Sequence, residues 1–124
     1  MTSGGDSPGM NPCIRAVVRT AMARNVQVLG ITGGFEGMIQ GNFKPMGARD
    51  VGGILQHGGT ILQTARCNDF KTPQGRLKAL REMNRNGMDA VIVIGGDGSL
   101  NGALALFDEG VPVVGIPASI DNDI

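Results

Sequence analysis

The chain is 124 residues long and carries eleven basic and eleven acidic residues, so its formal net charge is zero. That balance excludes a strong field of the kind that draws proteins to nucleic acid or to an anionic membrane surface. Two cysteines are too few for a disulfide framework. Because no apolar run reaches the length of a membrane span and no signal-peptide pattern opens the chain, we expect a cytoplasmic protein.

The first glycine-rich stretch, residues 2–11, combines hydroxyl residues, glycines and an aspartate just before a helical pattern. Pro12 suits the first turn of that helix, and apolar residues recur at helical spacing through 14–22. Arg15 and Arg19 are four residues apart and therefore lie on one side of the helix. They form either a solvated face or a clamp for a phosphate group.

The next part of the chain mixes short elements with glycine-rich turns. Residues 26–31 predict a strand and residues 32–37 a loop. Residues 49–57 predict a short helix that two internal glycines weaken. His57, the one histidine, has no acid or nucleophile near it in the sequence, so we expect a surface or capping residue. Residues 60–65 predict a short strand.

Arg66 follows that predicted strand, at the position where open α/β sheets bind ligands. A loop arginine without a partner is an equally good interpretation of this residue. Further along, Thr72 and Pro73 predict the start of a helix, with an apolar stripe and a stop at Gly87. The stripe consists of Leu77, Leu80 and Met83.

Residues 91–94 are four β-branched apolar residues in a row and predict a strand buried on both faces, as in a parallel sheet. A glycine-rich turn at 95–99 leads directly into a helical pattern. The apolar positions of that helix are Leu100, Ala103, Leu104 and Phe107. Glycines at such a turn let backbone N–H groups approach an anion at the N-terminus of the helix.

Asp97 is the unusual residue of this turn, since a carboxylate repels phosphate unless a cation lies between them. A Mg²⁺-phosphate site resolves the conflict, because Mg²⁺ is commonly held by one or two carboxylates together with substrate phosphates. The alternative is an ordinary glycine-rich turn in which Asp97 caps the helix. Neither a Rossmann fingerprint nor a Walker A loop is present, since Asn101 stands at the third glycine and no Gly-Lys-Ser/Thr occurs.

The last exit, residues 117–123, follows a predicted buried strand at 111–116 and carries Asp121 and Asp123. One carboxylate can act as a general base while the other positions a metal or a substrate. The alternative is a polar turn, since aspartate and asparagine both favour turns. The three glycine- or aspartate-rich exits should lie along one rim of one parallel sheet, and together they favour phosphoryl transfer.

These stretches resemble the motifs of the 6-phosphofructokinases of the ATP-dependent bacterial type, in order and in spacing. The matching residues are 2–11, 58–60 with 65–66, 95–99 and 120–123. The resemblance covers nearly the whole chain and implies a doubly wound α/β fold with a mostly parallel sheet and helices on both faces. Residues 1–124 would then be a partial ATP-binding domain of a two-domain fold, without the first strand and the C-terminal remainder.

The resemblance also implies roles for individual residues. Contacts to ATP are implied for Gly5, Arg66, Cys67, Gly96, Asp97, Gly98 and Ser99, with Asp97 as the Mg²⁺ ligand. Contacts to fructose 6-phosphate are implied for Ser119, Ile120, Asp121 and Asp123, and Asp121 would take the proton from the 1-hydroxyl. Binding of an allosteric effector is implied for Arg15, Arg19 and, with a one-residue shift, Arg49.

The activity implied by the resemblance is transfer of the γ-phosphate of ATP to fructose 6-phosphate in glycolysis, by an enzyme that is tetrameric in the parent family. ATP is implied as donor because the pyrophosphate-using relatives carry an aspartate at Gly98 and a lysine at Ala118. We expect no turnover from the 124 residues alone, since groups that position the sugar phosphate would lie beyond Ile124. The alternatives are a non-catalytic nucleotide-binding module and an NAD- or lipid-kinase-like enzyme that shares the Gly-Gly-Asp-Gly loop.

Overall fold

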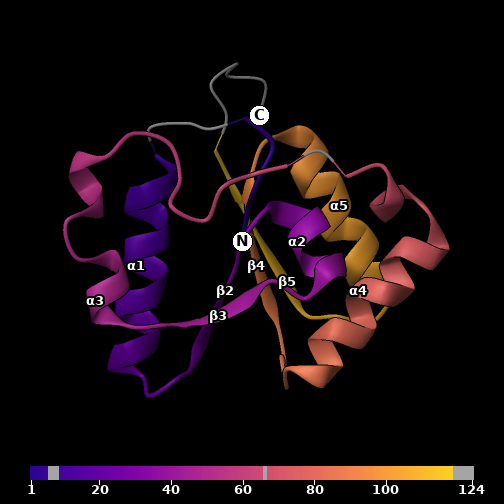
Figure 1. The fold of residues 1–124 in the computed structure, drawn as a ribbon, viewed down its shortest axis with the longest axis horizontal. Helices are drawn as coiled ribbons and strands as arrows, with labels where there is room; N and C mark the ends of the chain where they lie inside the picture. The colour runs from indigo at the N-terminus through magenta and orange to yellow at the C-terminus, as the bar shows by residue number, and fades with distance from the viewer. Residues whose placement is uncertain (6–8, 66, 119–124) are drawn as a thin grey trace.

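The computed structural model describes residues 1–5, 9–65 and 67–118, which form helices, strands and 3₁₀ turns (Figure 1). In chain order the elements are β1 (Thr2–Ser3), α1 (Met10–Ala23), β2 (Val28–Ile31), α2 (Gly34–Gln40), β3 (Phe43–Met46), α3 (Ala48–Val51), the 3₁₀ turns η1 (Ile54–Gln56) and η2 (Asp69–Lys71), α4 (Pro73–Arg85), β4 (Val91–Gly95), α5 (Asp97–Asp108) and β5 (Val113–Pro117).

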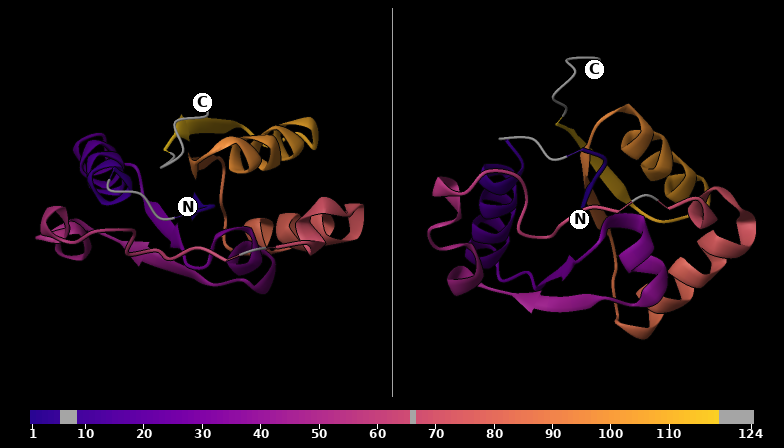
Figure 2. Two further views of the ribbon diagram at one scale, coloured as in Figure 1. Left: turned by 90° about the horizontal axis from the view of Figure 1, so that it is seen from above. Right: turned by 45° about the horizontal axis from the view of Figure 1, so that its top comes forward.

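A parallel sheet with the strand order β1-β4-β5 lies at the centre of the fold. Strand β2 pairs with β3 in a separate antiparallel sheet of two strands. The predicted strand at 26–31 is therefore confirmed as β2, but it is not a member of the parallel sheet. Figures 1 and 2 show α1 and α3 on one side of the strands and α2, α4 and α5 on the other.

Strand β4 is buried on both faces, as its four consecutive β-branched residues predict. Val91 and Val93 belong to a core cluster that includes buried side chains of α2, α4 and α5. Ile92 and Ile94 point the other way, into a second cluster around α1. Side chains alternate between the two faces of a strand, so a strand between two helical layers needs apolar residues at every position. The predicted fold, with helices on both faces of a parallel sheet, is confirmed.

Two local predictions are wrong. The segment 32–37 is not a loop, because most of it lies in helix α2, where Phe35 and Met38 are buried in the core. The segment 60–65 is not a strand, because it forms turns whose hydrogen-bond partners come from other parts of the chain. Tertiary contacts outweigh local propensity in both segments. The 49–57 helix is present as two pieces, α3 and η1, separated at the glycines.

The buried face of α5 also differs from the predicted stripe. Leu104 and Phe107 are 57% and 60% exposed, whereas Ser99, Ala103 and Leu106 are the buried residues of this helix. The helix therefore packs through a face rotated from the one that its apolar spacing indicates. Helix α4 begins as predicted, since the Thr72 hydroxyl accepts a hydrogen bond from the backbone N–H of Gly75 at 3.0 Å.

A first strand was not expected from the sequence, yet residues Thr2 and Ser3 form one and pair with Ile94 and Gly95 of β4. The register is extended by Met1, whose carbonyl accepts a hydrogen bond from the Ile94 N–H at 2.9 Å. Two residues therefore suffice to place the first glycine loop beside the loop that follows β4. Within the described part of the chain, the helices lack the combination of length and apolar character needed to cross a membrane.

Candidate functional site at the carboxyl edge of the sheet

The carboxyl ends of β1, β4 and β5 lie side by side, and we call this end of the sheet the carboxyl edge. Ser3 is in register with Gly95, and Gly95 is in register with Pro117. The backbone N–H of Ala118 donates to the Gly95 carbonyl at 2.9 Å, which extends the pairing past the end of β5. The sequence-predicted rim is therefore present for the described residues of all three exits.

The carboxyl edge is closely packed around Gly95. A Cβ atom at Gly95 would lie 2.5 Å from the Ser3 carbonyl oxygen and 2.5 Å from the Ser99 hydroxyl. Ser99 is only 4% exposed, so its side chain fills the space between the two glycine loops. Gly4, with φ +81°, leaves room for the same hydroxyl. Close approach of two loops therefore requires the glycines here.

Asp97 occupies the first position of helix α5, and the N-cap residue is Gly96. The suggestion that Asp97 itself caps the helix is therefore wrong. Asp97 is exposed and stands in the first turn of the helix, where backbone N–H groups have no partner within the helix. A carboxylate oxygen at this place suits Mg²⁺, which prefers oxygen ligands and accepts phosphates as its remaining partners. Within 1–5, 9–65 and 67–118 there is no cluster of three or more His, Cys, Asp or Glu side chains.

Gly5 and Gly98 are both exposed, and a Cβ atom at either would meet no heavy atom of the described residues within 4 Å, apart from chain neighbours and the backbone of its own helix. Both positions therefore leave open space at the carboxyl edge. Asp6, Arg66 and the candidate substrate residues lie outside the described residues. Those substrate candidates are Ser119, Ile120, Asp121 and Asp123.

Cys67 is half-buried and packs against the core cluster that contains Phe70. Burial raises the pKa of the Cys67 thiol, and the side-chain hydrogen bond with Glu36 raises it further. A thiol with a raised pKa stays protonated at neutral pH and is a weak nucleophile. Cys67 therefore offers surface for contact with a ligand rather than covalent chemistry.

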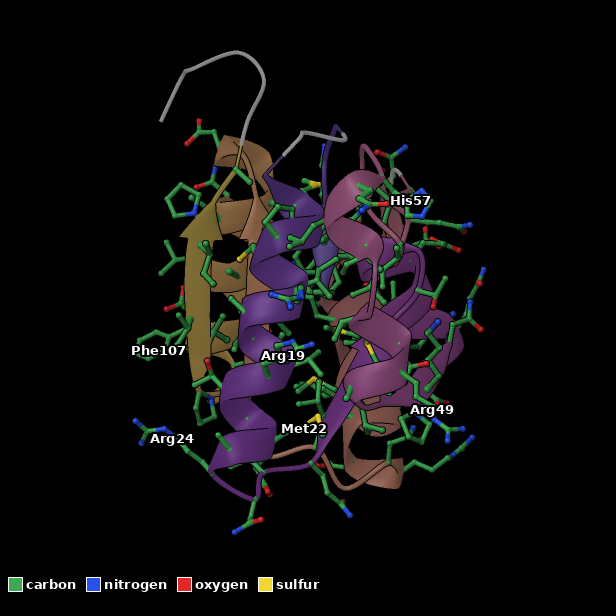
Figure 3. The ribbon with its side chains drawn as sticks, turned by 90° about the vertical axis from the view of Figure 1, so that its left-hand side faces the viewer. Arg19, Met22, Arg24, Arg49, His57 and Phe107 are labelled. Carbon is green, nitrogen blue, oxygen red and sulfur yellow. The ribbon has the colours of Figure 1, made fainter. Side chains whose placement is uncertain are left out.

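The three effector candidates lie on neighbouring helices. Arg15 and Arg19 are on α1 and Arg49 is on α3, with Arg49 at the outer side of its helix (Figure 3). Arg15 is half-buried and the other two are exposed. His57 is exposed and follows η1 as its C-cap, as the sequence predicts for a surface or capping residue.

Sequence reasoning missed a set of buried polar side chains that join the first glycine stretch to residues 57–63. Thr2 and Asn11 are 0% and 1% exposed, and both bond to this later segment. Among the described residues, every buried side-chain nitrogen or oxygen has a hydrogen-bond partner. Asn11 and Thr2 both belong to the first glycine-rich stretch, residues 2–11. Their hydrogen-bond partners are 46 to 61 residues away, and no signal in the sequence identifies them.

A cavity of about 890 Å³ opens at the other end of the sheet, between α1, β2 and the start of β4. Its walls include apolar side chains such as Val17, Val28 and Ile92, and none of the candidate site residues lines it. The cavity is therefore separate from the candidate functional site at the carboxyl edge. We call it the amino-end groove.

Comparisons with known proteins agree with this geometry. The whole chain, residues 1–124, matches the family described as Phosphofructokinase. It is 56% identical to ATP-dependent 6-phosphofructokinase 1 of Thermus thermophilus, over 99% of this chain and 38% of that protein. It is 50% identical to the ATP-dependent 6-phosphofructokinase of Thermotoga petrophila, over 100% of this chain and 39% of that protein. The chain therefore spans under two fifths of these curated relatives.

Solved structures give the same result. Phosphofructokinase of Pichia pastoris in the T-state superimposes with a TM-score of 0.96 at 44% identity, over 100% of this chain and 16% of that chain. Phosphofructokinase of Saccharomyces cerevisiae superimposes with a TM-score of 0.90 at 40% identity, over 99% of this chain and 20% of that chain. These matches do not favour the NAD- or lipid-kinase alternative. Because the family match extends over all 124 residues of this chain, and because the carboxyl edge has the geometry described above, the chain belongs to the phosphofructokinase family.

Proposed function

We propose that this chain supplies the ATP-binding edge of an ATP-dependent 6-phosphofructokinase, which transfers the γ-phosphate of ATP to the 1-hydroxyl of fructose 6-phosphate. The observation that carries the proposal is the register of β1, β4 and β5, which brings three exits to one edge. In open α/β sheets, ligands bind outside the carboxyl ends of the strands. Phosphoryl transfer depends chiefly on positioning and on charge stabilisation, which several loops at one edge can provide together.

The N-terminus of α5 is the proposed phosphate site. Helix α5 has twelve residues, and its first backbone N–H groups lie beside the open space at Gly98. Unpaired N–H groups and the helix dipole both favour an anion at this position. Asp97 would hold Mg²⁺, which when bound neutralises the phosphate charge and orients the triphosphate. Gly5, from the neighbouring loop, contributes further open space for the nucleotide.

Asp121 is the proposed general base. A sugar hydroxyl is a weak nucleophile at neutral pH, and a carboxylate that takes its proton as the new bond forms lowers the barrier. The support is the placement of β5, whose exit is held beside Gly95 by the Ala118 hydrogen bond. Ser119, Ile120 and Asp123 would bind fructose 6-phosphate from the same exit.

The remaining expectations also stand as proposals. Arg15, Arg19 and Arg49 would bind a nucleotide or small-metabolite effector, which the proximity of α1 and α3 supports (Figure 3). The full enzyme would be a cytoplasmic tetramer, a proposal that rests on the resemblance to the parent family. The isolated 124 residues would show no turnover, since groups that position the sugar phosphate would come from the rest of the enzyme.

A substitution at Gly98 tests the nucleotide site directly. Because a Cβ atom here meets no atom of the described residues outside its own helix within 4 Å, we expect Gly98→Asp to leave the fold intact and to act on the ligand. We expect it to lower the affinity for Mg²⁺-ATP by about tenfold or more, since it places a carboxylate against the α-phosphate. Gly98→Ala is the matched control and should bind within about threefold of the native chain. Calorimetric titration of the chain gives both affinities.

Equal ATP affinity in Gly98→Asp and Gly98→Ala would contradict the proposed site. A chimeric enzyme tests the catalytic part of the proposal. In this chimera, residues 1–124 replace the matching segment of the Thermus thermophilus relative. In this chimera Asp121→Ser should lower kcat by about 10²–10⁴-fold with a smaller change in KM for fructose 6-phosphate. A kcat close to that of the unmodified chimera would remove Asp121 from the role of base.

A further inference from the structure

The segment 57–63 runs across the carboxyl edge as a loop that other parts of the chain hold in place. The backbone N–H of Gly33, just before α2, donates to the Leu62 carbonyl at 2.9 Å. The Thr2 hydroxyl lies 2.9 Å from the Thr60 hydroxyl and donates to the Gln63 carbonyl at 3.2 Å. We call residues 57–63 the crossing loop. It leads through Thr64 and Ala65 to positions 66 and 67.

Asn11 holds the crossing loop at two points. Its Nδ2 donates to the His57 carbonyl at 3.1 Å, and its Oδ1 accepts from the Ile61 N–H at 2.8 Å. The side chain is 1% exposed and comes from the first turn of α1. One amide group thus fixes both ends of the 57–61 turn, which contains two glycines and has little conformational preference of its own.

The path of the chain after the crossing loop depends on this anchoring. Gln63 has a φ of +61°, an unfavourable conformation for a residue with a side chain, so the surrounding contacts must enforce it. Past it, the backbone of Ala65 lies close to α2, where a Cβ atom at Gly34 would be 3.7 Å from the Ala65 N and 3.2 Å from the Thr2 carbonyl. Contacts with β1, α1 and the start of α2 therefore place the chain as far as Ala65, and Cys67 follows two residues later.

We propose that Asn11 is a positioning residue for nucleotide binding, acting through the crossing loop on the segment that carries Cys67. This inference rests on the proposed function, in which Cys67 contacts ATP. Asn11 does not touch the ligand in this account. Because Asn11 belongs to α1, its two hydrogen bonds hold the crossing loop in a fixed position relative to this helix. The segment that would contact the nucleotide follows directly after the crossing loop.

The test compares two kinds of measurement on Asn11→Leu, which is similar in size and removes both hydrogen bonds. In the 124-residue chain, amide hydrogen exchange at Ile61 should accelerate about tenfold or more, relative to the Val93 amide of the buried strand β4. In the chimera with the Thermus thermophilus relative, KM for ATP should rise about tenfold, while kcat and KM for fructose 6-phosphate stay within about twofold. Asn84→Leu, at an exposed position of α4, is the matched control and should change none of these.

The split between KM and kcat separates positioning from a purely structural role. A variant that merely folds less well has fewer active molecules, which lowers the apparent kcat and leaves KM for ATP unchanged. That result, or an unchanged Ile61 exchange rate, would overturn the proposal. If Asn11→Leu does not fold, Asn11→Ser carries the same test, since its shorter side chain cannot reach both partners. An unmodified chimera without phosphofructokinase activity would refute the proposed function and this inference with it, whereas an active chimera with an unchanged KM refutes the inference alone.

Discussion

The two ends of β4 differ in how the chain fills the space beside them. At the carboxyl edge, Gly95 lies so close to Ser3 and Ser99 that one added carbon would overlap both. At the amino end, Val91 and Ile92 border the amino-end groove, about 890 Å³ of space lined largely by apolar side chains. The same strand therefore has an end without room for one methyl group and an end with room for several side chains.

The buried polar groups at the two ends have hydrogen-bond partners of different kinds. At the carboxyl edge, the buried side chains of Thr2 and Asn11 have partners in the crossing loop. At the amino end, the amino group of Met1 is buried and donates to the Ile92 carbonyl at 2.8 Å. Burial lowers the pKa of this amine from 8.0 to about 6. The two ends therefore differ in packing, since the carboxyl edge has no space for one more carbon atom whereas the groove has space for larger apolar side chains.

The largest expected effect is at the carboxyl edge. Gly95→Ala should lower the free energy of unfolding by about 3 kcal/mol or more, because the Ser3 carbonyl it meets is backbone and cannot move aside cheaply. Gly98→Ala is the control, in the first turn of α5 with open space around it. It should be neutral or stabilising by up to about 1 kcal/mol, since alanine favours helix more than glycine does. Urea unfolding measures both, and equal stabilities would show that the edge is not close-packed.

The second effect is a pH dependence that originates at the amino end. Since the folded state lowers the pKa of the Met1 amine from 8.0 to about 6, the unfolded chain binds more protons between these values. Stability should therefore rise as the pH increases from 6 to 8, by at most about 3 kcal/mol. Burial also raises the pKa of the neighbouring Cys13 thiol above its ordinary 9.0, so stability should fall again at higher pH.

Thermal unfolding of the chain across pH 5.5 to 8.5 measures this rise. The control is the chain with an acetylated N-terminus, which cannot take up the proton and retains an N–H to donate. The acetylated chain should lose the Met1 contribution to the rise. If both forms show the same pH profile, then the buried amine is not its source.

The smallest effect is a gain from filling the amino-end groove. Ala21→Leu adds apolar volume where α1 borders the groove, and leucine is nearly as good a helix former as alanine. We expect stabilisation by about 0.5–1 kcal/mol. Ala23→Leu, at an exposed position of the same helix outside the groove, is the matched control and should change stability by less. A destabilised Ala21→Leu would show that the groove is not available space.

Several elements were predictable because their signals are local. The strand, turn and helix around 91–99 follow from four β-branched residues and the glycines after them, all within one short window. The start of α4 follows from Thr72 and Pro73 in the same way. The three-exit rim was also predictable, since parallel strands that share a sheet deliver their following loops to one edge.

Other features depend on residues far apart in the chain. Helix α2 contains two glycines within seven residues and has a glycine at each cap, so its sequence favours a loop. It forms because Phe35 and Met38 are buried and Phe35 stacks on Phe70 at 4.2 Å. The face on which α5 packs was likewise decided by its neighbours. The space that Gly102 leaves for the Phe35 ring is one such contact, since a Cβ there would lie 2.6 Å from it.

The amino-acid sequence is sufficient to identify the family, the buried central strand and the residue types at its carboxyl edge. Glycine turns and aspartates at the ends of apolar strands are short-range patterns, so they can be recognised without knowledge of the rest of the fold. By contrast, the three-dimensional packing is needed to show that residues 60–65 form a loop and that Asn11 and Thr2 hold it. Those hydrogen bonds join residues 46 to 61 positions apart. Local propensity contains no information about partners at that distance, because they meet only after the sheet and its helices have packed.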